Sequence, residues 1–164
     1  MKRIYLVRHG IALPHGAPDV ADDDRPLTSK GEKRVEQIAR GLRRLGVAPD
    51  RVVTSPLPRA RRTAEIIADV LGRSSELEDS DSLRPGATAG SVREWLGTRG
   101  EERSMLVGHN PNLTELLGLL AGVTSSPLPF ELKKGGVAAI TDDGNGRTTI
   151  QWLATPRLIR RLSK

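Results

Sequence analysis

Short apolar segments that are typical of buried strands alternate along this chain with longer segments of helical periodicity. The strand segments are brief and rich in β-branched residues, and they fall within residues 2–8, 50–56, 75–77 and 104–108. The helical segments fall within residues 29–45, 55–71, 91–96 and 110–121. Such alternation predicts parallel strands that are covered by helices on both faces.

The end of the sequence has a different pattern. Two β-prone segments, GGVAAIT at residues 135–141 and TTIQWLA at residues 148–154, flank the turn-rich residues 142–146. This pattern predicts a hairpin, which adds at least one antiparallel strand. We therefore predict an α/β fold, a three-layer α/β/α sandwich with a mixed, mostly parallel sheet and a C-terminal β-hairpin.

Several residues are typical of helix ends. Ser29 and Glu32 have the spacing of a capping box for the first helix, and Gly46 lies just beyond its end. Ser55 precedes a proline and is expected to cap the second helix, as Asn110 is expected to cap the fourth.

Composition narrows the class of protein. With 164 residues the chain is long enough to bury about 70% of its unfolded surface around one core, so we expect one domain. The absence of cysteine excludes disulfides, thiol catalysis and cysteine–zinc sites. The apolar run after Met1–Arg3 is too short for an export signal, and no run approaches the roughly 20 residues of a bilayer span. We expect a cytoplasmic protein without a membrane partner.

The net charge of +6 comes mainly from arginine, with twenty arginines against six lysines. A forked guanidinium suits phosphate oxygens better than an ammonium does, although solvated helix faces also account for arginine-rich sequences. The chain has only four aromatic residues, which leaves little for stacking on single-stranded nucleic acid. We predict no specific nucleic-acid partner, while non-specific binding to duplexes stays open.

Polar residues that suit phosphate chemistry follow three of the predicted strands. Arg8 and His9 end the first strand, Thr54–Ser55 end the second and lead to Arg59, and His109 ends the strand at residues 104–108. In open α/β sheets, ligands bind outside the carboxyl ends of the strands. Two arginines, two histidines and two helix N-termini are therefore predicted to form one pocket for a doubly charged phosphoryl group.

Other interpretations of these residues stay open at this point. A histidine at a strand end is often only a hydrogen-bonded structural group, and Arg59 also fits a solvated helix start. A metal site is disfavoured, because the chain has no H-x-H or H-E-x-x-H pattern and the neighbouring arginines would repel a cation. We predict no metal and no cofactor. His15, in a loop with proline and glycine, is expected to be a surface residue.

Four motifs together resemble those of the histidine phosphatase superfamily, and within it the small SixA-type phosphohistidine phosphatases. They are LVRHG, RPLTSKG, SPLPRARRTAE and VGHNP, in this order. The resemblance runs from Ile4 to about Trp152 and implies that residues 1–164 form a single histidine phosphatase domain with a phosphoglycerate mutase-like fold.

The resemblance also implies roles for individual residues. His9 is the expected phosphoryl acceptor, and Arg8, Arg59 and His109 are expected to bind the phosphoryl group. Arg25, in the RPLT motif, matches an arginine that SixA-like enzymes place beside the site. Gly10 and Asn110 are expected to contribute to substrate binding.

The expected reaction has two steps, in which His9 takes the phosphoryl group and water then hydrolyses the phosphohistidine enzyme. This requires a neutral His9 ring with its other nitrogen held by a carbonyl group. The expected partner is a phosphorylated protein that carries phosphohistidine, or a small phosphorylated molecule.

Many relatives that cleave phosphate esters are expected to use a carboxylic acid as proton donor. Here Glu78, Asp79 and Asp81 lie in the corresponding region without a clear match, and they also fit a solvated acidic loop. The missing match favours phosphohistidine, whose imidazole leaves more easily than an alkoxide. The absence of room for a large lid favours a protein substrate. Two alternatives stay open: a phosphatase for small phosphate esters or anhydrides such as sugar phosphates, and a non-catalytic module that binds polyanions. The loop at residues 14–24 is expected to be mobile.

Overall fold

The computed structural model describes residues 1–164 and contains one six-stranded sheet. The order of the strands is β3-β2-β4-β1-β5-β6. Their bounds are β1 Lys2–Arg8, β2 Arg51–Thr54, β3 Leu77–Asp79, β4 Arg103–Gly108, β5 Val137–Asp142 and β6 Thr148–Ala154. The strands β1, β4, β2 and β3 are parallel, whereas β5 and β6 pair antiparallel. The predicted mixed sheet and C-terminal hairpin are confirmed.

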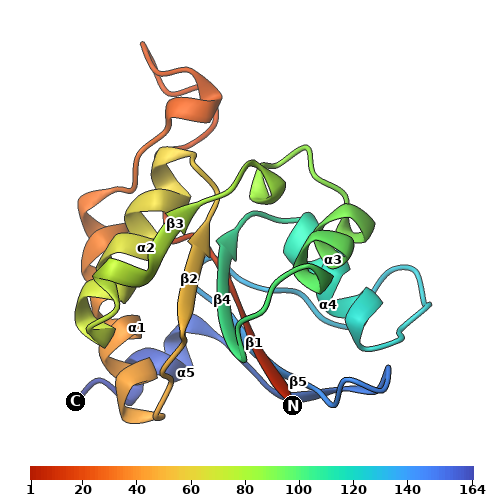
Figure 1. The fold of residues 1–164 in the computed structure, drawn as a ribbon. Coiled ribbons are helices and arrows are strands. Elements are labelled where there is room, and N and C mark those ends of the chain that lie inside the picture. The colour runs from red at the N-terminus through yellow and green to blue at the C-terminus, as the bar shows by residue number, and fades with distance from the viewer.

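Helices cover both faces of the sheet, as Figure 1 shows. Helices α1, α2 and α5 pack on one face, and α3 and α4 pack on the other. Their bounds are α1 Ser29–Arg44, α2 Pro58–Leu71, α3 Ala89–Gly97, α4 Asn112–Leu120 and α5 Pro156–Arg161. Short 3-10 helices occupy Asp22–Asp24, Ser74–Glu76 and Asp81–Leu83. None of the helices combines the length and apolar character needed to cross a membrane.

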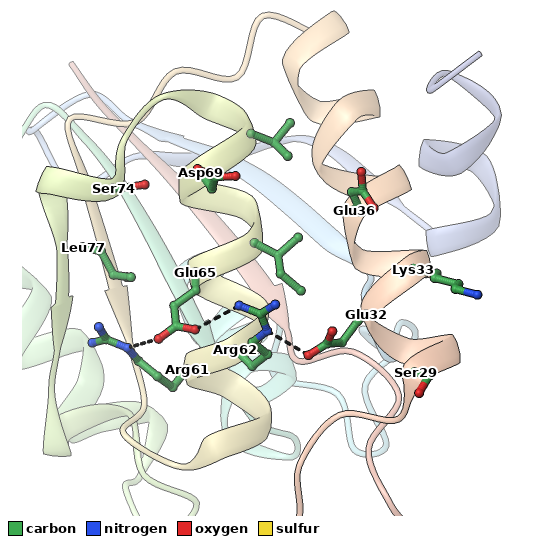
Figure 2. Close-up of a pocket in the computed structure, with 12 residues that line it drawn as sticks. Ser29, Glu32, Lys33, Glu36, Arg61, Arg62, Glu65, Asp69, Ser74 and Leu77 are labelled. Carbon is green, nitrogen blue, oxygen red and sulfur yellow. Dashed lines mark hydrogen bonds and ion pairs between the residues drawn. The ribbon is translucent and has the colours of Figure 1, made fainter.

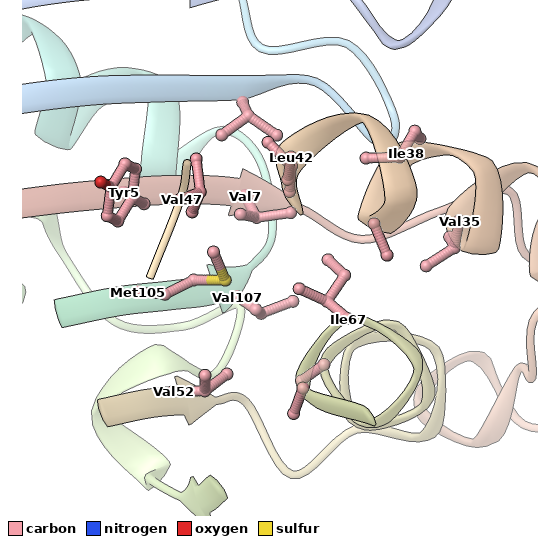
Figure 3. Close-up of a cluster of buried hydrophobic side chains, with 14 of the residues drawn as sticks. Tyr5, Val7, Val35, Ile38, Leu42, Val47, Val52, Ile67, Met105 and Val107 are labelled. Carbon is pink, nitrogen blue, oxygen red and sulfur yellow. The ribbon is translucent and has the colours of Figure 1, made fainter. Parts of the chain in front are cut away.

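Alternation along β1 divides the core into two clusters. Tyr5 and Val7 face the larger cluster, which α1 and α2 complete with residues such as Leu42 and Ile67 (Figure 3). Ile4 and Leu6 face the second cluster under α3 and α4. Each fully buried aliphatic side chain stabilises the fold by about 1.5–3 kcal/mol, so β1 is fixed from both sides.

The register of the strands brings their carboxyl ends to one edge. Arg8 pairs with Gly108, and Thr54 pairs with Val107. Backbone hydrogen bonds continue this strand pairing one residue further: His9 N donates to Gly108 O at 3.0 Å, and Ser55 N donates to Val107 O at 2.9 Å. The residues that follow the three strands therefore meet.

The predicted caps of the first two helices are wrong. The first helix is capped by Thr28, whose Oγ1 accepts a bond from Gly31 N at 2.9 Å, and not by Ser29. Glu32 consequently has no capping role and pairs with an arginine instead. The second helix begins only at Pro58, and no side chain caps it, so Ser55 is not its cap.

The fourth helix also begins later than predicted, at Asn112, and Asn110 does not cap its backbone. The third strand lies at Leu77–Asp79 and not at residues 75–77, because Ser74–Glu76 form a 3-10 turn. The short helix α5 was not predicted. It buries only Ile159, so its sequence has no apolar periodicity.

Candidate active site

Two buried histidines lie side by side at the carboxyl edge of the sheet. His9 follows β1 and His109 follows β4, and the two residues are only 6% and 3% exposed. The ring centroids are 5.2 Å apart, and the ring planes make an angle of 56°. The predicted meeting of the two imidazoles is therefore present in the structure.

The orientation of the His9 ring is fixed through Nδ1. This nitrogen lies 2.7 Å from the carbonyl oxygen of Gly10 and donates to it, because a carbonyl only accepts. A neutral ring in this tautomer carries its free lone pair on Nε2. Gly10 N donates to Thr63 Oγ1 at 3.0 Å, and Thr63 Oγ1 donates to Arg59 O at 2.7 Å, so α2 is tied to this segment.

His109 is held by Ser55, which the sequence placed at the sheet edge and predicted to cap the second helix. The distance from His109 Nε2 to Ser55 Oγ is 2.8 Å. The other ring nitrogen, Nδ1, is buried and has no partner within the protein. Ser55 ends β2 at the same edge as the histidines, and this position was the signal that marked it as a site residue.

Arg8 and Arg59 each bring a guanidinium group that is only partly used. Arg8 Nη1 donates to Leu132 O at 3.0 Å, and Arg59 Nη1 donates to Asp22 O at 3.1 Å. The Nε atoms of both arginines are buried without a protein partner. Unpaired buried donors of this kind are uncommon in native proteins and are suited to an anion.

Arg25 lies next to this pair, but its guanidinium is occupied by its own loop. It donates from Nε to Asp22 Oδ1 at 2.7 Å and from Nη1 to Leu13 O at 2.6 Å. Its Nη2 lies 3.3 Å from His15 Nε2. His15 is exposed, as predicted, and its Nδ1 contacts the Asp22 carboxylate. Arg25 therefore orders the 13–25 segment, which projects beyond the sheet edge in Figure 1.

Asn110 also has its polar groups occupied. Its Nδ2 donates to Leu132 O at 2.9 Å, and its Oδ1 accepts from Thr114 Oγ1 at 2.9 Å. Arg8 binds the same Leu132 carbonyl. Asn110 thus holds the segment before β5 against the site.

The electrostatics of the site favour uncharged imidazoles. Burial lowers the pKa of His9 to about 4, with further lowering by Arg59 and Arg8, although the Gly10 carbonyl opposes this. Burial lowers the pKa of His109 to about 3, and the neighbouring His9 and Arg59 contribute to the shift. Both rings are therefore neutral at pH 7 in the free protein.

The three acidic residues considered as proton donors are engaged with arginines. Asp79 pairs with Arg61 at 2.7 Å and Asp81 with Arg84 at 2.6 Å. Glu78 pairs with Arg99 at 2.5 Å. A different carboxylate, Glu131, contacts Arg8: its Oε1 lies 3.4 Å from Arg8 Nη1. Glu131 lies in a loop outside every sequence motif, so no pattern marked it.

The largest cavity of the molecule, about 650 Å³, lies elsewhere, between α1, α2 and β3 (Figure 2). We call it the α1–α2 cavity. Both of its arginines have carboxylate partners: Arg62 pairs with Glu32 at 2.8 Å, and Arg61 pairs with Glu65 at 3.0 Å. It contains no histidine, so its chemistry differs from that of the sheet edge.

The sheet edge has the character of a phosphoryl-transfer site, and comparison with known proteins gives its class. The sequence model of the histidine phosphatase superfamily (branch 1) matches residues 4–85. Phosphohistidine phosphatase SixA of Escherichia coli strain K12 is 30% identical over 159 residues, which are 94% of each chain. The chain belongs to the histidine phosphatase superfamily and is a phosphatase with a phosphoglycerate mutase-like fold.

Two further proteins are similar to this chain. An uncharacterized protein of Picosynechococcus sp. is 39% identical over 143 residues, 84% of this chain and 83% of the relative. The solved structure of protein histidine phosphatase SixA complexed with tungstate is 28% identical, with a TM-score of 0.82, over 96% of this chain and 99% of that chain. The similarity to SixA proteins thus extends over nearly the whole chain.

Proposed function

We propose that this phosphatase removes the phosphoryl group from phosphohistidine on a protein, through a covalent intermediate on His9. The observation that carries the proposal is the state of the His9 ring. It is neutral, it is fixed through Nδ1 on the Gly10 carbonyl, and its Nε2 has no hydrogen-bond partner in the protein. A ring in this state is an oriented nucleophile.

The first step transfers the phosphoryl group to the enzyme. The Nε2 lone pair of His9 forms a bond to phosphorus while the bond between phosphorus and the substrate imidazole breaks. The substrate ring carries a proton on its other nitrogen, so it keeps that electron pair and leaves as neutral imidazole. In the second step, water attacks phosphorus, inorganic phosphate departs, and the electron pair returns to His9 Nε2.

Fixed donors stabilise the charge on the transferred group. The unpaired Nε–H groups of Arg8 and Arg59 are suited to bind its oxygens. When the Ser55 hydroxyl donates to His109 Nε2, the proton of the neutral His109 ring is on Nδ1, which becomes a third donor. Arg25, Gly10 and Asn110 position these groups: Arg25 orders its loop, Gly10 orients His9, and Asn110 holds the Leu132 carbonyl that binds Arg8.

The state of the acidic residues supports phosphohistidine as substrate. Glu78, Asp79 and Asp81 are paired with arginines, and none of them hydrogen-bonds to a residue of the site. An ester would need a proton donor for its strongly basic alkoxide, whereas imidazole is a weak base and leaves with less help. The SixA relatives, one a named phosphohistidine phosphatase and one bound to the oxyanion tungstate, support the same class of substrate.

Phosphoenzyme trapping tests this proposal. Wild-type protein is incubated with phosphorus-labelled phosphohistidine, quenched within the first turnover and mapped by mass spectrometry. We expect the label on His9 and a loss of at least about 10³ in turnover for His9→Ala. Equal turnover by His9→Ala would overturn the mechanism. A preference for sugar phosphates over phosphohistidine in a substrate panel would instead favour a phosphatase for small esters.

A further inference from the structure

A second group of basic side chains lies beside the active site, and the proposed mechanism does not use it. Two adjoining cavities of about 270 Å³ each share Arg157 and Arg160. We call them together the basic cleft. Their basic lining residues include Arg34, Lys134, Arg157, Arg160 and Arg161, and no acidic side chain lines either cavity.

The basic cleft is built by three separate parts of the fold. Arg34 belongs to α1, Lys134 to the segment before β5, and the other arginines to α5. Helix α5 lies against α1, where the carbonyl of Ile159 approaches Gly41 so closely that any larger residue at 41 would collide with it. Figure 1 shows the two helices on the same side of the sheet. Tertiary packing therefore fixes the position of the basic groups.

These five basic groups have no acidic partner. None of the five forms an ion pair or a side-chain hydrogen bond within the chain. The Nε of Arg160 is buried and unpartnered. Like charges gathered in this way repel one another, and an anionic ligand relieves the repulsion and supplies the missing acceptor.

The basic cleft lies next to the segments that hold the proposed nucleophile. Gly10 and Gly135 line it, and both touch His9: the Gly10 carbonyl accepts from His9 Nδ1, and Gly135 N donates to the His9 carbonyl at 3.1 Å. A substrate that places its phosphoryl group at His9 therefore has neighbouring parts within reach of the cleft.

Accordingly, and building on the proposed function, we infer that the basic cleft is a docking site for the acidic surface of the phosphorylated protein substrate. A single phosphate or carboxylate would need only two or three donors. Six basic side chains, the five named above and Lys164, line the two adjoining cavities and fit several carboxylates, as an acidic protein surface presents them.

Binding of an acidic peptide tests the docking site without relying on catalysis. The probe is a fluorescein-labelled peptide of eight glutamates, measured by anisotropy at low salt. The cleft variant is Arg157→Gln/Arg160→Gln. The control is Arg43→Gln/Arg44→Gln, which removes the same charge from exposed residues at the end of α1 that line neither cavity.

We expect the cleft variant to weaken peptide binding by about tenfold and the control to change it less than about twofold. An equal loss in both variants would show that only net charge matters and would overturn the inference. Tighter binding of a DNA duplex, lost in the same cleft variant, would also overturn it and reassign the cleft to nucleic acid.

Kinetics with two substrates separates this inference from the proposed function. For a phosphohistidine peptide with flanking glutamates, the cleft variant should raise KM about tenfold with kcat unchanged. For free phosphohistidine both constants should stay the same. Equal KM increases for the two substrates would contradict docking. Failure of the wild type to hydrolyse either substrate would refute the proposed function, while the peptide-binding experiment would still decide the role of the cleft.

Discussion

The beginning of α2 carries arginines in two opposite states within one turn. Arg61 and Arg62 line the α1–α2 cavity and are paired with Glu65, Asp79 and Glu32. Arg59 is buried, and its Nε has no partner. Pairing with Asp79 raises the pKa of Arg61, whereas burial lowers the pKa of Arg59. Arg61 and Arg62 are paired within the chain, whereas Arg59 has a buried donor that only a ligand can pair.

In this molecule, whether a charged side chain has a partner within the protein identifies a binding site better than the volume of a cavity does. The α1–α2 cavity has a volume of about 650 Å³, but both of its arginines already have carboxylate partners (Figure 2). At the sheet edge, Arg8, Arg59 and His109 retain buried nitrogens without partners. A buried donor without a partner costs about 1–3 kcal/mol, so its persistence at three neighbouring residues indicates a binding function.

Removing one arginine of each kind tests most directly whether an unpaired arginine marks the active site. Arg59→Ala removes a proposed donor to the transferred phosphoryl group and should lower kcat/KM by about 10²–10³. Arg62→Ala removes a surface ion pair and should change it less than about twofold. Steady-state kinetics on phosphohistidine measures both. Similar losses in the two variants would mean that the pairing state of an arginine does not mark the site.

A folding control accompanies this experiment, because Arg59 also donates to Asp22 O. Circular dichroism of Arg59→Ala should show a native spectrum and a cooperative thermal transition. Arg59→Lys keeps a charge but loses the forked donor, so we expect it to recover only a small part of the activity. Full recovery with lysine would show that charge alone suffices.

Sequence patterns were sufficient for the sheet and for the residues that meet at its edge. Apolar runs fix the strands, and the carboxyl-edge rule then places Arg8, His9, Arg59 and His109 together. Helix ends were less predictable. Serine and asparagine often cap helices, but the side chain of Ser55 hydrogen-bonds to His109 and that of Asn110 hydrogen-bonds to the segment before β5. Tertiary partners thus overrode the local preference of these residues.

The basic cleft and the state of Arg25 lay beyond sequence reasoning for a related reason. Arg34 and Arg160 are far apart in the chain, and only the packing of α5 on α1 brings them to one cavity. Arg25 lies in the RPLT motif, but its guanidinium donates to the Asp22 side chain and to the Leu13 carbonyl. Which charges have partners is a property of the folded chain, and composition does not reveal it.

The burial of His9 also predicts a smaller effect, a dependence of folding stability on pH in the acidic range. His9 has a pKa of about 4 in the folded protein, against about 6.5 when unfolded. Between these values the unfolded chain binds a proton that the folded chain does not, so stability falls as pH is lowered from about 6.5 towards 4. The stabilisation is fully present above that range. The loss attributable to His9 is at most about 3 kcal/mol.

Urea denaturation at several pH values measures this loss. We expect the free energy of unfolding of His9→Asn to depend less steeply on pH between 4 and 6.5 than that of the wild type. Arg62→Gln should keep the wild-type slope, because arginine stays charged in both states. An unchanged slope in His9→Asn would contradict a buried neutral imidazole.

The smallest effect is expected where the charges are already paired. Arg62 and Glu32 lie 2.8 Å apart with about half of each side chain exposed, so water screens their attraction. A double-mutant cycle with Arg62→Gln and Glu32→Gln should give a coupling energy of at most about 1 kcal/mol, or about 2–4 °C in Tm for a chain of this size. The coupling should weaken further in high salt. A coupling of several kcal/mol that persists in salt would place this pair in a dry environment, and the contrast between the α1–α2 cavity and the sheet edge would lose its physical basis.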